Sequence, residues 1–167
     1  TINTVLEGLS PKVADLLKAE VIMNIVSNLS PERIVKSFFE IPVERLTTDK
    51  IDGKEVAKKI VEANEIGKFD IFRACTHNKG IMNGIDAICL AVGQDVRAIE
   101  ASCHVYSIYK YGNYRCLTNY FLSDNGNTLR GELEIPFTLG TKGGSTNSNQ
   151  LYQVNLELMG NPTSREL

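Results

Sequence analysis

Apolar positions in the first half of the chain follow two different periods. Two segments show helical spacing, and two others are dense in β-branched and aromatic residues, as strands are. Ser10 and Pro11 form a helix-start signal, because serine caps a helix and proline suits its first turn. The predicted segments are helix in two pieces over 1–19, strands over 20–28 and 33–41, and a helix over 53–66 that Gly67 ends.

The second half combines a buried helix with a hairpin. Small and apolar residues occupy several faces of residues 81–92, which predicts a buried helix and not a surface one. Asp95 is placed to cap a further helix over 96–110, and a last helix is expected over 148–159. The Asn-Gly pair within residues 123–127 predicts a hairpin between two strands. The predicted fold class is therefore α+β, with a central buried helix against antiparallel strands.

Composition narrows the functional classes. The chain has 167 residues, 43% of them hydrophobic, and a formal net charge of −2, so nucleic acid is not an expected partner. No apolar run approaches the roughly 20 residues of a membrane helix, and no signal peptide is visible. The four cysteines form no C-x-x-C pair, so we expect reduced thiols, no bound metal and a cytoplasmic location.

The stretch FRACTHNKGIMNGIDAICLAVGQD, residues 72–95, places a single lysine, Lys79, before an apolar segment. A desolvated ammonium can stabilise an oxyanion that forms on a carbonyl, and a carboxylate such as Asp95 would keep it protonated. On one straight helix the two residues would lie about 24 Å apart. Either a glycine lets the chain fold back, or Asp95 meets the Lys79 of a second subunit. The alternative is a surface lysine and a helix-capping aspartate.

Other polar residues near Lys79 have two interpretations each. Arg73 could clamp a substrate carboxylate or form a solvated ion pair, and Asn83 could orient an acid or cap a helix. His77 could be a general acid, but a single histidine without a partner is more often structural. Cys75 has no base placed by the sequence. The later GTKGG loop lacks the spacing of phosphate-binding motifs.

The block RACTHNKGIMNGIDAICLAVGQD is similar to class II, bacterial-type 3-hydroxy-3-methylglutaryl-coenzyme A (HMG-CoA) reductases. The resemblance continues through VRAIEASCHVY, where Val96 replaces the usual tryptophan, and GELEIPFTLGTKGGST. TINTVLEGL and SNL, in the first 30 residues, also match the family. The similarity covers nearly the whole chain.

The resemblance implies a role for five residues. Lys79 matches the family's catalytic lysine, which stabilises the oxyanion, and Asp95 matches the aspartate that tunes it. Arg73 matches the arginine that binds the carboxylate of the hydroxymethylglutaryl group. Asn83 matches an asparagine of the catalytic network, and Asn28 matches a contact to the nicotinamide cofactor.

The family implies a reaction and an assembly. It reduces HMG-CoA to mevalonate and free coenzyme A by two hydride transfers from NADH or NADPH. It does so in a homodimer whose active sites lie between subunits. Residues 1–28 would be the end of a small, inserted, ferredoxin-like cofactor domain, and residues 29–167 would belong to the large catalytic domain.

Some family features are missing from the sequence. The family's catalytic glutamate and D-A-M-G-x-N cofactor motif would precede Thr1, its catalytic histidine would follow Leu167, and STNSNQ replaces the usual A-T-K-T-H-P. We therefore expect an internal fragment that does not turn over alone. The alternatives are a non-catalytic coenzyme A-binding or dimerisation module, and an enzyme that forms a Schiff base on Lys79.

Overall fold

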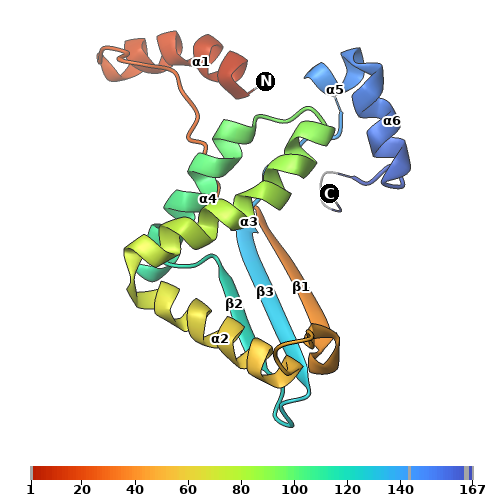
Figure 1. Ribbon diagram of the computed structural model, residues 1–167. Coiled ribbons are helices and arrows are strands. Elements are labelled where there is room, and N and C mark those ends of the chain that lie inside the picture. The colour runs from red at the N-terminus through yellow and green to blue at the C-terminus, as the bar shows by residue number, and fades with distance from the viewer. Residues whose placement is uncertain (1, 143, 164–165, 167) are drawn as a thin grey trace.

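The computed structural model describes residues 2–142, 144–163 and 166, and it is an α+β structure (Figure 1). Thr1, where the first predicted helix begins, lies outside these residues, as do four positions of the predicted second domain. The described elements are α1 (Ile2–Leu17), β1 (Ile34–Pro42), a 3-10 helix η1 (Val43–Leu46), α2 (Gly53–Phe69), α3 (Ile71–Ala91), α4 (Val96–Tyr111), β2 (Thr118–Leu122), β3 (Thr128–Pro136), α5 (Gly144–Ser148) and α6 (Gln150–Leu158).

The strands form one antiparallel sheet in the order β1-β3-β2, so β3 is central and β1 and β2 are its edges. Figure 1 shows the three strands side by side below α3 and α4, with α2 alongside them. The predicted hairpin is confirmed, with Leu122 opposite Leu129 at its closed end. Pro42 ends β1 as predicted. This register fixes which side chains of β1 and β3 face the helices.

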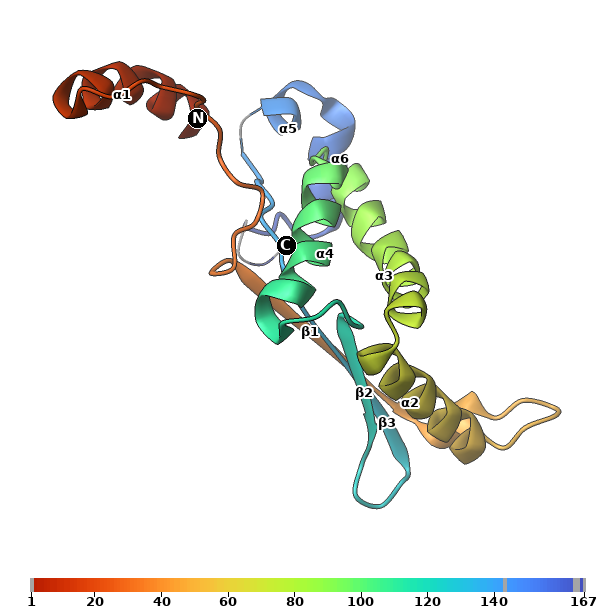
Figure 2. The ribbon, with the colours of Figure 1, turned by 90° about the vertical axis from the view of Figure 1, so that its left-hand side faces the viewer.

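The core lies between one stripe of α3, the inner face of α4 and the sheet. The stripe of α3 recurs at helical spacing: Ala74, Asn78, Met82, Ile85 and Cys89. Figure 2 shows α3 and α4 lying alongside each other above the strands. A smaller cluster of Val43, Ala57 and Leu129 joins α2 to the other end of the sheet. The long helix is therefore held along one side only.

Two predictions for the first segment were wrong. Residues 20–28 form no strand, because no described segment lies beside them to complete a ladder, and Ile22 and Met23 are exposed. The first helix is continuous, and Pro11 lies inside it. Ser10 does not cap a helix, since its hydroxyl donates to the carbonyl of Leu6 one turn earlier. No described residue of α1 is buried, and α1 stands apart from the rest in both views (Figures 1 and 2).

Two predictions for the central helices also need correction. Gly67 does not end α2; it lies buried inside the helix, where a Cβ would overlap Cys116 Sγ. The helix predicted over 81–92 begins ten residues earlier, at Ile71, because Asp70 caps it by accepting from the backbone N–H of Phe72. It is also not buried on all sides, since Leu90 on its outer face is 63% exposed.

Asp95 caps α4 as predicted, accepting from the backbone N–H of Ala98 at 3.1 Å. The last predicted helix, over 148–159, is confirmed as α6, which the side chain of Asn149 caps, and the short helix α5 precedes it. Cys75, Cys89, Cys103 and Cys116 are all free thiols. Within the described residues, no helix combines the length and the apolar content needed to cross a membrane.

Glu134 on β3 links three elements. Its carboxylate accepts from Lys110 Nζ of α4 at 2.6 Å and from Tyr106 OH at 2.7 Å, and it lies 3.4 Å from Lys36 Nζ of β1. These contacts, led by Lys110 and then Tyr106, lower the pKa of Glu134 to about 2 from its ordinary value of 4.5. The carboxylate of Glu134 is therefore ionised in the native state, and its hydrogen bonds to Lys110 and Tyr106 hold α4 against the sheet.

We expect Glu134→Gln to lower the free energy of unfolding by about 2 kcal/mol at pH 7. The pKa of Glu134 is lower in the folded chain, so its stabilisation is present above pH 4.5 and is lost as pH falls toward 2. Urea unfolding at pH 7 and pH 3 measures this. A difference between wild type and variant that stays constant with pH would contradict it.

Candidate functional site

The residues predicted to carry chemistry lie mostly on the outer side of α3. Lys79 and Asn83 are one turn apart and exposed, and Arg73 is half-buried nearer the start of the helix. Among the described residues, neither the ammonium of Lys79 nor the amide of Asn83 has a hydrogen-bond or ion-pair partner. The two side chains are therefore available to a ligand or to another chain.

The structure does not bring Lys79 and Asp95 together within this chain. Gly80 and Gly84 lie inside an unbroken α3, and the chain turns only at Gly93, with φ of 70°. Lys79 precedes the end of α3 by about 18 Å of helix, and Asp95 lies beyond that end. The first of the two routes, a fold-back of the chain, is therefore wrong. The capping role of Asp95 is confirmed.

Side chains next to Lys79 anchor α3 from the inside. Asn78 is fully buried; its amide donates to the carbonyl of Arg115 at 3.0 Å and accepts from the N–H of Leu117 at 2.9 Å. The ring of His77 hydrogen-bonds through Nε2 to the hydroxyl of Thr118. Burial and then the charge of Arg73 lower the pKa of His77. His77 is thus half-buried and bonded to the sheet, and its structural interpretation is the better one.

Asn28, the predicted cofactor contact, lies in the exposed irregular segment between α1 and β1. Its neighbour Ser27 accepts from the N–H of Leu29 at 3.1 Å, which fixes the local turn. No hydrogen bond or ion pair in the described part of the chain joins Asn28 to any of the four residues predicted around Lys79. The five predicted residues are therefore spread over three places in this chain.

One acidic pair escaped the sequence interpretation. Asp86 on α3 lies beside Glu100 on α4, and one of its carboxylate oxygens is buried without a hydrogen-bond partner. Burial and then the charge of Glu100 raise the pKa of Asp86, whereas nearby His104 lowers it. Asp86 is a charged residue within a stretch of mostly small and apolar residues. That contrast is the signal by which the sequence could have indicated this site.

The thiols beside this pair are unreactive. Burial raises the pKa of Cys89 to about 11 and that of Cys103 to about 12, so both remain protonated at neutral pH. Cys75 is the exposed thiol, and no histidine or carboxylate of the described residues hydrogen-bonds it. A cysteine nucleophile has no support from this arrangement.

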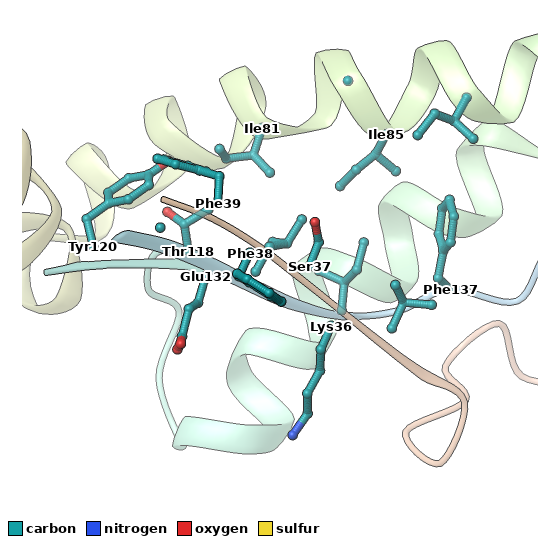
Figure 3. A pocket seen from close by; sticks show the side chains of 16 residues that line it. Lys36, Ser37, Phe38, Phe39, Ile81, Ile85, Thr118, Tyr120, Glu132 and Phe137 are labelled. Carbon is teal, nitrogen blue, oxygen red and sulfur yellow. The ribbon is translucent and has the colours of Figure 1, made fainter. Parts of the chain in front are cut away.

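An open apolar pocket of about 540 Å³ separates α3 from the sheet (Figure 3). Ile81 and Ile85 of α3 face Phe39 and Ser37 of β1 across it, and Tyr120 closes one end. Lys79 does not line this pocket. The lining of the pocket comes from α3 and from all three strands of the sheet, and Arg73 and Asn83 also lie outside it.

Comparison with known proteins identifies the class to which this arrangement belongs. The sequence profile of the hydroxymethylglutaryl-coenzyme A reductase family matches residues 1–167. The 3-hydroxy-3-methylglutaryl-coenzyme A reductase of Archaeoglobus fulgidus is 39% identical over 99% of this chain, and a probable reductase of Borreliella burgdorferi is 37% identical over 92%. The chain therefore belongs to the hydroxymethylglutaryl-coenzyme A reductase family.

Solved structures place the chain within the class II branch. The class II reductase of Streptococcus pneumoniae bound to NADPH superposes with a TM-score of 0.87, at 39% identity over 99% of this chain. A second structure from the same organism gives a TM-score of 0.86 at 38% identity. The chain spans 36% of the length of the Archaeoglobus and Borreliella proteins and 40% of the NADPH-bound chain.

We expect Asn78→Ala to lower the free energy of unfolding by about 1–3 kcal/mol, because it leaves the buried N–H of Leu117 without a partner and removes one of the two hydrogen bonds to the carbonyl of Arg115, which still accepts from the hydroxyl of Ser107. The adjacent Lys79→Ala is the matched control and should change stability by less than about 0.5 kcal/mol, since its side chain is exposed. Urea unfolding measures both. Equal losses in the free energy of unfolding at positions 78 and 79 would contradict the assignment of Asn78 to the inner face of α3 and of Lys79 to its outer face.

We expect Asp86→Asn to stabilise the chain at pH 7. The pKa of Asp86 is higher in the folded chain, so wild-type stability falls as pH rises from the ordinary 3.8 through the raised value. The amide carries no charge, and wild-type Asp86 is itself protonated at pH 3, so the gain in stability over wild type should disappear there. Thermal unfolding at both values measures it, with Asp124→Asn in the exposed hairpin loop as control. An Asp86→Asn variant that is less stable than wild type at pH 7 would contradict the prediction that the ionised carboxylate of Asp86 destabilises the folded chain.

Proposed function

We propose that the whole protein that contains this chain reduces HMG-CoA to mevalonate and coenzyme A, in the pathway that leads to isoprenoids, using two molecules of NADH or NADPH. One observation carries the proposal: the block around Lys79 lies on a helix anchored from inside by Asn78, with Lys79 and Asn83 exposed one turn apart. A firmly held ammonium with no internal partner suits charge stabilisation. The match of the family over residues 1–167 supports the same reaction.

In this proposal Lys79 acts on the carbonyl oxygen of the thioester. Hydride addition to the carbonyl carbon moves an electron pair onto that oxygen, and the Lys79 ammonium stabilises the oxyanion. Expulsion of the coenzyme A thiolate, which takes up a proton, leaves an aldehyde. A second addition repeats the charge development at the same oxygen, and protonation gives the alcohol. Arg73 binds the distal carboxylate of the substrate, and Asn83 holds the polar network beside Lys79.

The nicotinamide cofactor supplies the hydride when it is bound. Asn28 is the residue of this chain proposed to contact it, and its exposed amide, which has no hydrogen-bond partner in the described residues, fits that role. One structural relative is bound to NADPH, which supports a nicotinamide cofactor and leaves both forms in the proposal. Residues 1–28 would belong to a small, ferredoxin-like cofactor domain, and the separation of α1 from the other helices supports that division from residues 29–167.

We also propose a homodimer with active sites between subunits. Asp95 tunes a lysine in this proposal, yet it lies beyond the end of the helix that carries Lys79. A second subunit can supply the missing contact, because both side chains are exposed. The four free thiols support a cytoplasmic location, where cysteines remain reduced.

The test is oxidation of NADH and NADPH by the full-length protein in the presence of HMG-CoA. We expect Lys79→Ala to lower kcat at least 100-fold, because it removes an oxyanion donor. Lys58→Ala on α2, whose exposed side chain lies 3.8 Å from Glu62, is the matched control and should retain activity.

Two further arms sharpen this test. The 167-residue chain alone should give no turnover, because it spans 36% of the length of the relatives it matches. Full activity of Lys79→Ala would contradict the role of the lysine. Coenzyme A binding without any turnover by the full-length protein would favour a non-catalytic binding module, and capture of a carbonyl substrate on Lys79 by borohydride would favour a Schiff base.

A further inference from the structure

Gln94 and Asp95 are the two residues that link the turn at the end of α3 to the start of α4. Gly93 ends the turn in the left-handed conformation, with φ of 70°, and the backbone N–H of Gln94 donates to the carbonyl of Cys89 at 2.8 Å. This is the hydrogen bond of a Schellman motif, which closes the end of a helix. Asp95 then begins α4, because one of its carboxylate oxygens accepts from the N–H of Ala98.

The side chain of Gln94 ties this link to the loop that follows β3. Its oxygen accepts from the backbone N–H of Gly140 at 3.0 Å, and its nitrogen donates to the carbonyl of Gly140 at 2.7 Å and to that of Val92 at 3.1 Å. The amide therefore uses both of its N–H donors and its oxygen. Leu139, next to Gly140, is buried in the main core, so Gln94 is bonded to a segment that is itself anchored.

Two other side chains bond the same end of α3 without reaching the link. Asn155 of α6 donates to the carbonyl of Ala91 at 2.7 Å, and Ser145 of α5 donates to the carbonyl of Gly93 at 2.9 Å. Both satisfy carbonyls that a helix end leaves without partners. Among the described residues, the contacts with Gly140 are the only hydrogen bonds that join residues 94–95 to a segment outside the two helices and their turn.

An amide also precedes the other charge of the candidate site. Asn78 bonds the carbonyl of Arg115 and the N–H of Leu117, just before β2, and Lys79 is the next residue. In both places the amide bonds a backbone donor and a backbone acceptor of a distant segment beside the sheet. In both places the residue that follows presents an exposed charge. The two charges are thus attached to the sheet in the same manner.

We propose that Gln94 is a positioning residue for Asp95, and that its contacts with Gly140 hold the Asp95 carboxylate where it tunes Lys79. The inference rests on the proposed function, in which Asp95 keeps the lysine protonated while the oxyanion forms. The effect of one charge on another falls with distance, so a small displacement of the carboxylate weakens it. Without the Gln94 amide, the bond from Ala98 still caps α4, but the link is no longer held against the core.

The test is steady-state turnover of HMG-CoA by the full-length protein carrying Gln94→Met. Methionine is close to glutamine in length and volume but makes none of the three hydrogen bonds. We expect kcat to fall about ten-fold or more while KM for HMG-CoA stays within about two-fold, because Arg73, which binds the substrate carboxylate in the proposal, lies at the other end of α3.

Asn155→Ala is the matched control for this loss. It removes a 2.7 Å hydrogen bond from the end of the same helix, but it touches neither the link nor Gly140, so kcat and KM should stay at their wild-type values. Equal falls in kcat for Asn155→Ala and Gln94→Met would overturn the inference, since any loosening at the end of α3 would then have the same effect.

A double-mutant cycle tests whether Gln94 acts through Asp95. Asp95→Asn removes the charge but keeps a side chain that caps helices as well as aspartate does. In the Asp95→Asn background, Gln94→Met should change kcat by less than about two-fold, because no carboxylate is left to position. A loss of the same size in both backgrounds would overturn the inference, since the effect would not pass through Asp95.

The outcomes separate this inference from the proposed function. A wild-type protein that oxidises neither NADH nor NADPH with HMG-CoA would overturn both. An active wild type, an inactive Lys79→Ala and an unchanged Gln94→Met would overturn the positioning role alone. If Gln94→Met does not fold, Gln94→Asn replaces it, because this amide is one methylene too short to keep both bonds to Gly140. Its kcat should fall in the same way, and a wild-type kcat would again overturn the inference.

Discussion

The two hydrogen bonds of the Asn78 amide determine where the central helix lies. Leaving a buried backbone donor or acceptor without a partner costs free energy, and Asn78 supplies partners to both the carbonyl of Arg115 and the N–H of Leu117. Because these bonds fix the rotation of α3 about its axis, Lys79, the next residue, must face outward. The outward orientation of the Lys79 ammonium thus follows from the buried amide of Asn78, which carries no charge. The apolar stripe through Met82 and Ile85 keeps α3 in the same orientation along its length.

Local signals in the sequence predicted the elements whose stability is local. The Asn-Gly turn identified the hairpin, and Asp95 identified the start of α4. Residues 20–28 have the composition of a strand, but a strand exists only when another backbone bonds to it, and the sequence cannot specify that neighbour. Gly67 seemed to be a terminator, whereas its small size serves the approach of Cys116 from a distant segment. Both errors concern long-range contacts.

The candidate site was predictable in a different way. The sequence block that contains Lys79, Asn83 and Asp95 resembles that of the family, and the sequence profile and the relatives then confirmed the membership. Their arrangement in space was not predictable from spacing, because it depends on α3 remaining straight through Gly80 and Gly84. Asp86 was missed because a single carboxylate in an apolar stretch gains meaning only when Glu100 of another helix is seen beside it. Sequence motifs thus identify the candidate site residues, whereas only the fold shows how far apart these residues lie.

The asparagine amides at the β2 edge have a consequence for the size of the assembly. A sheet with two open edges can add copies at both sides and grow into a fibre, whereas a sheet with one open edge closes after a single two-fold contact. The amide of Asn64 donates to the carbonyl of Thr118 and accepts from the N–H of Tyr120, and the amide of Asn78 bonds the residues just before β2, so side chains occupy this edge in place of another strand. Two amides inside the chain therefore prevent growth of the sheet at the β2 edge.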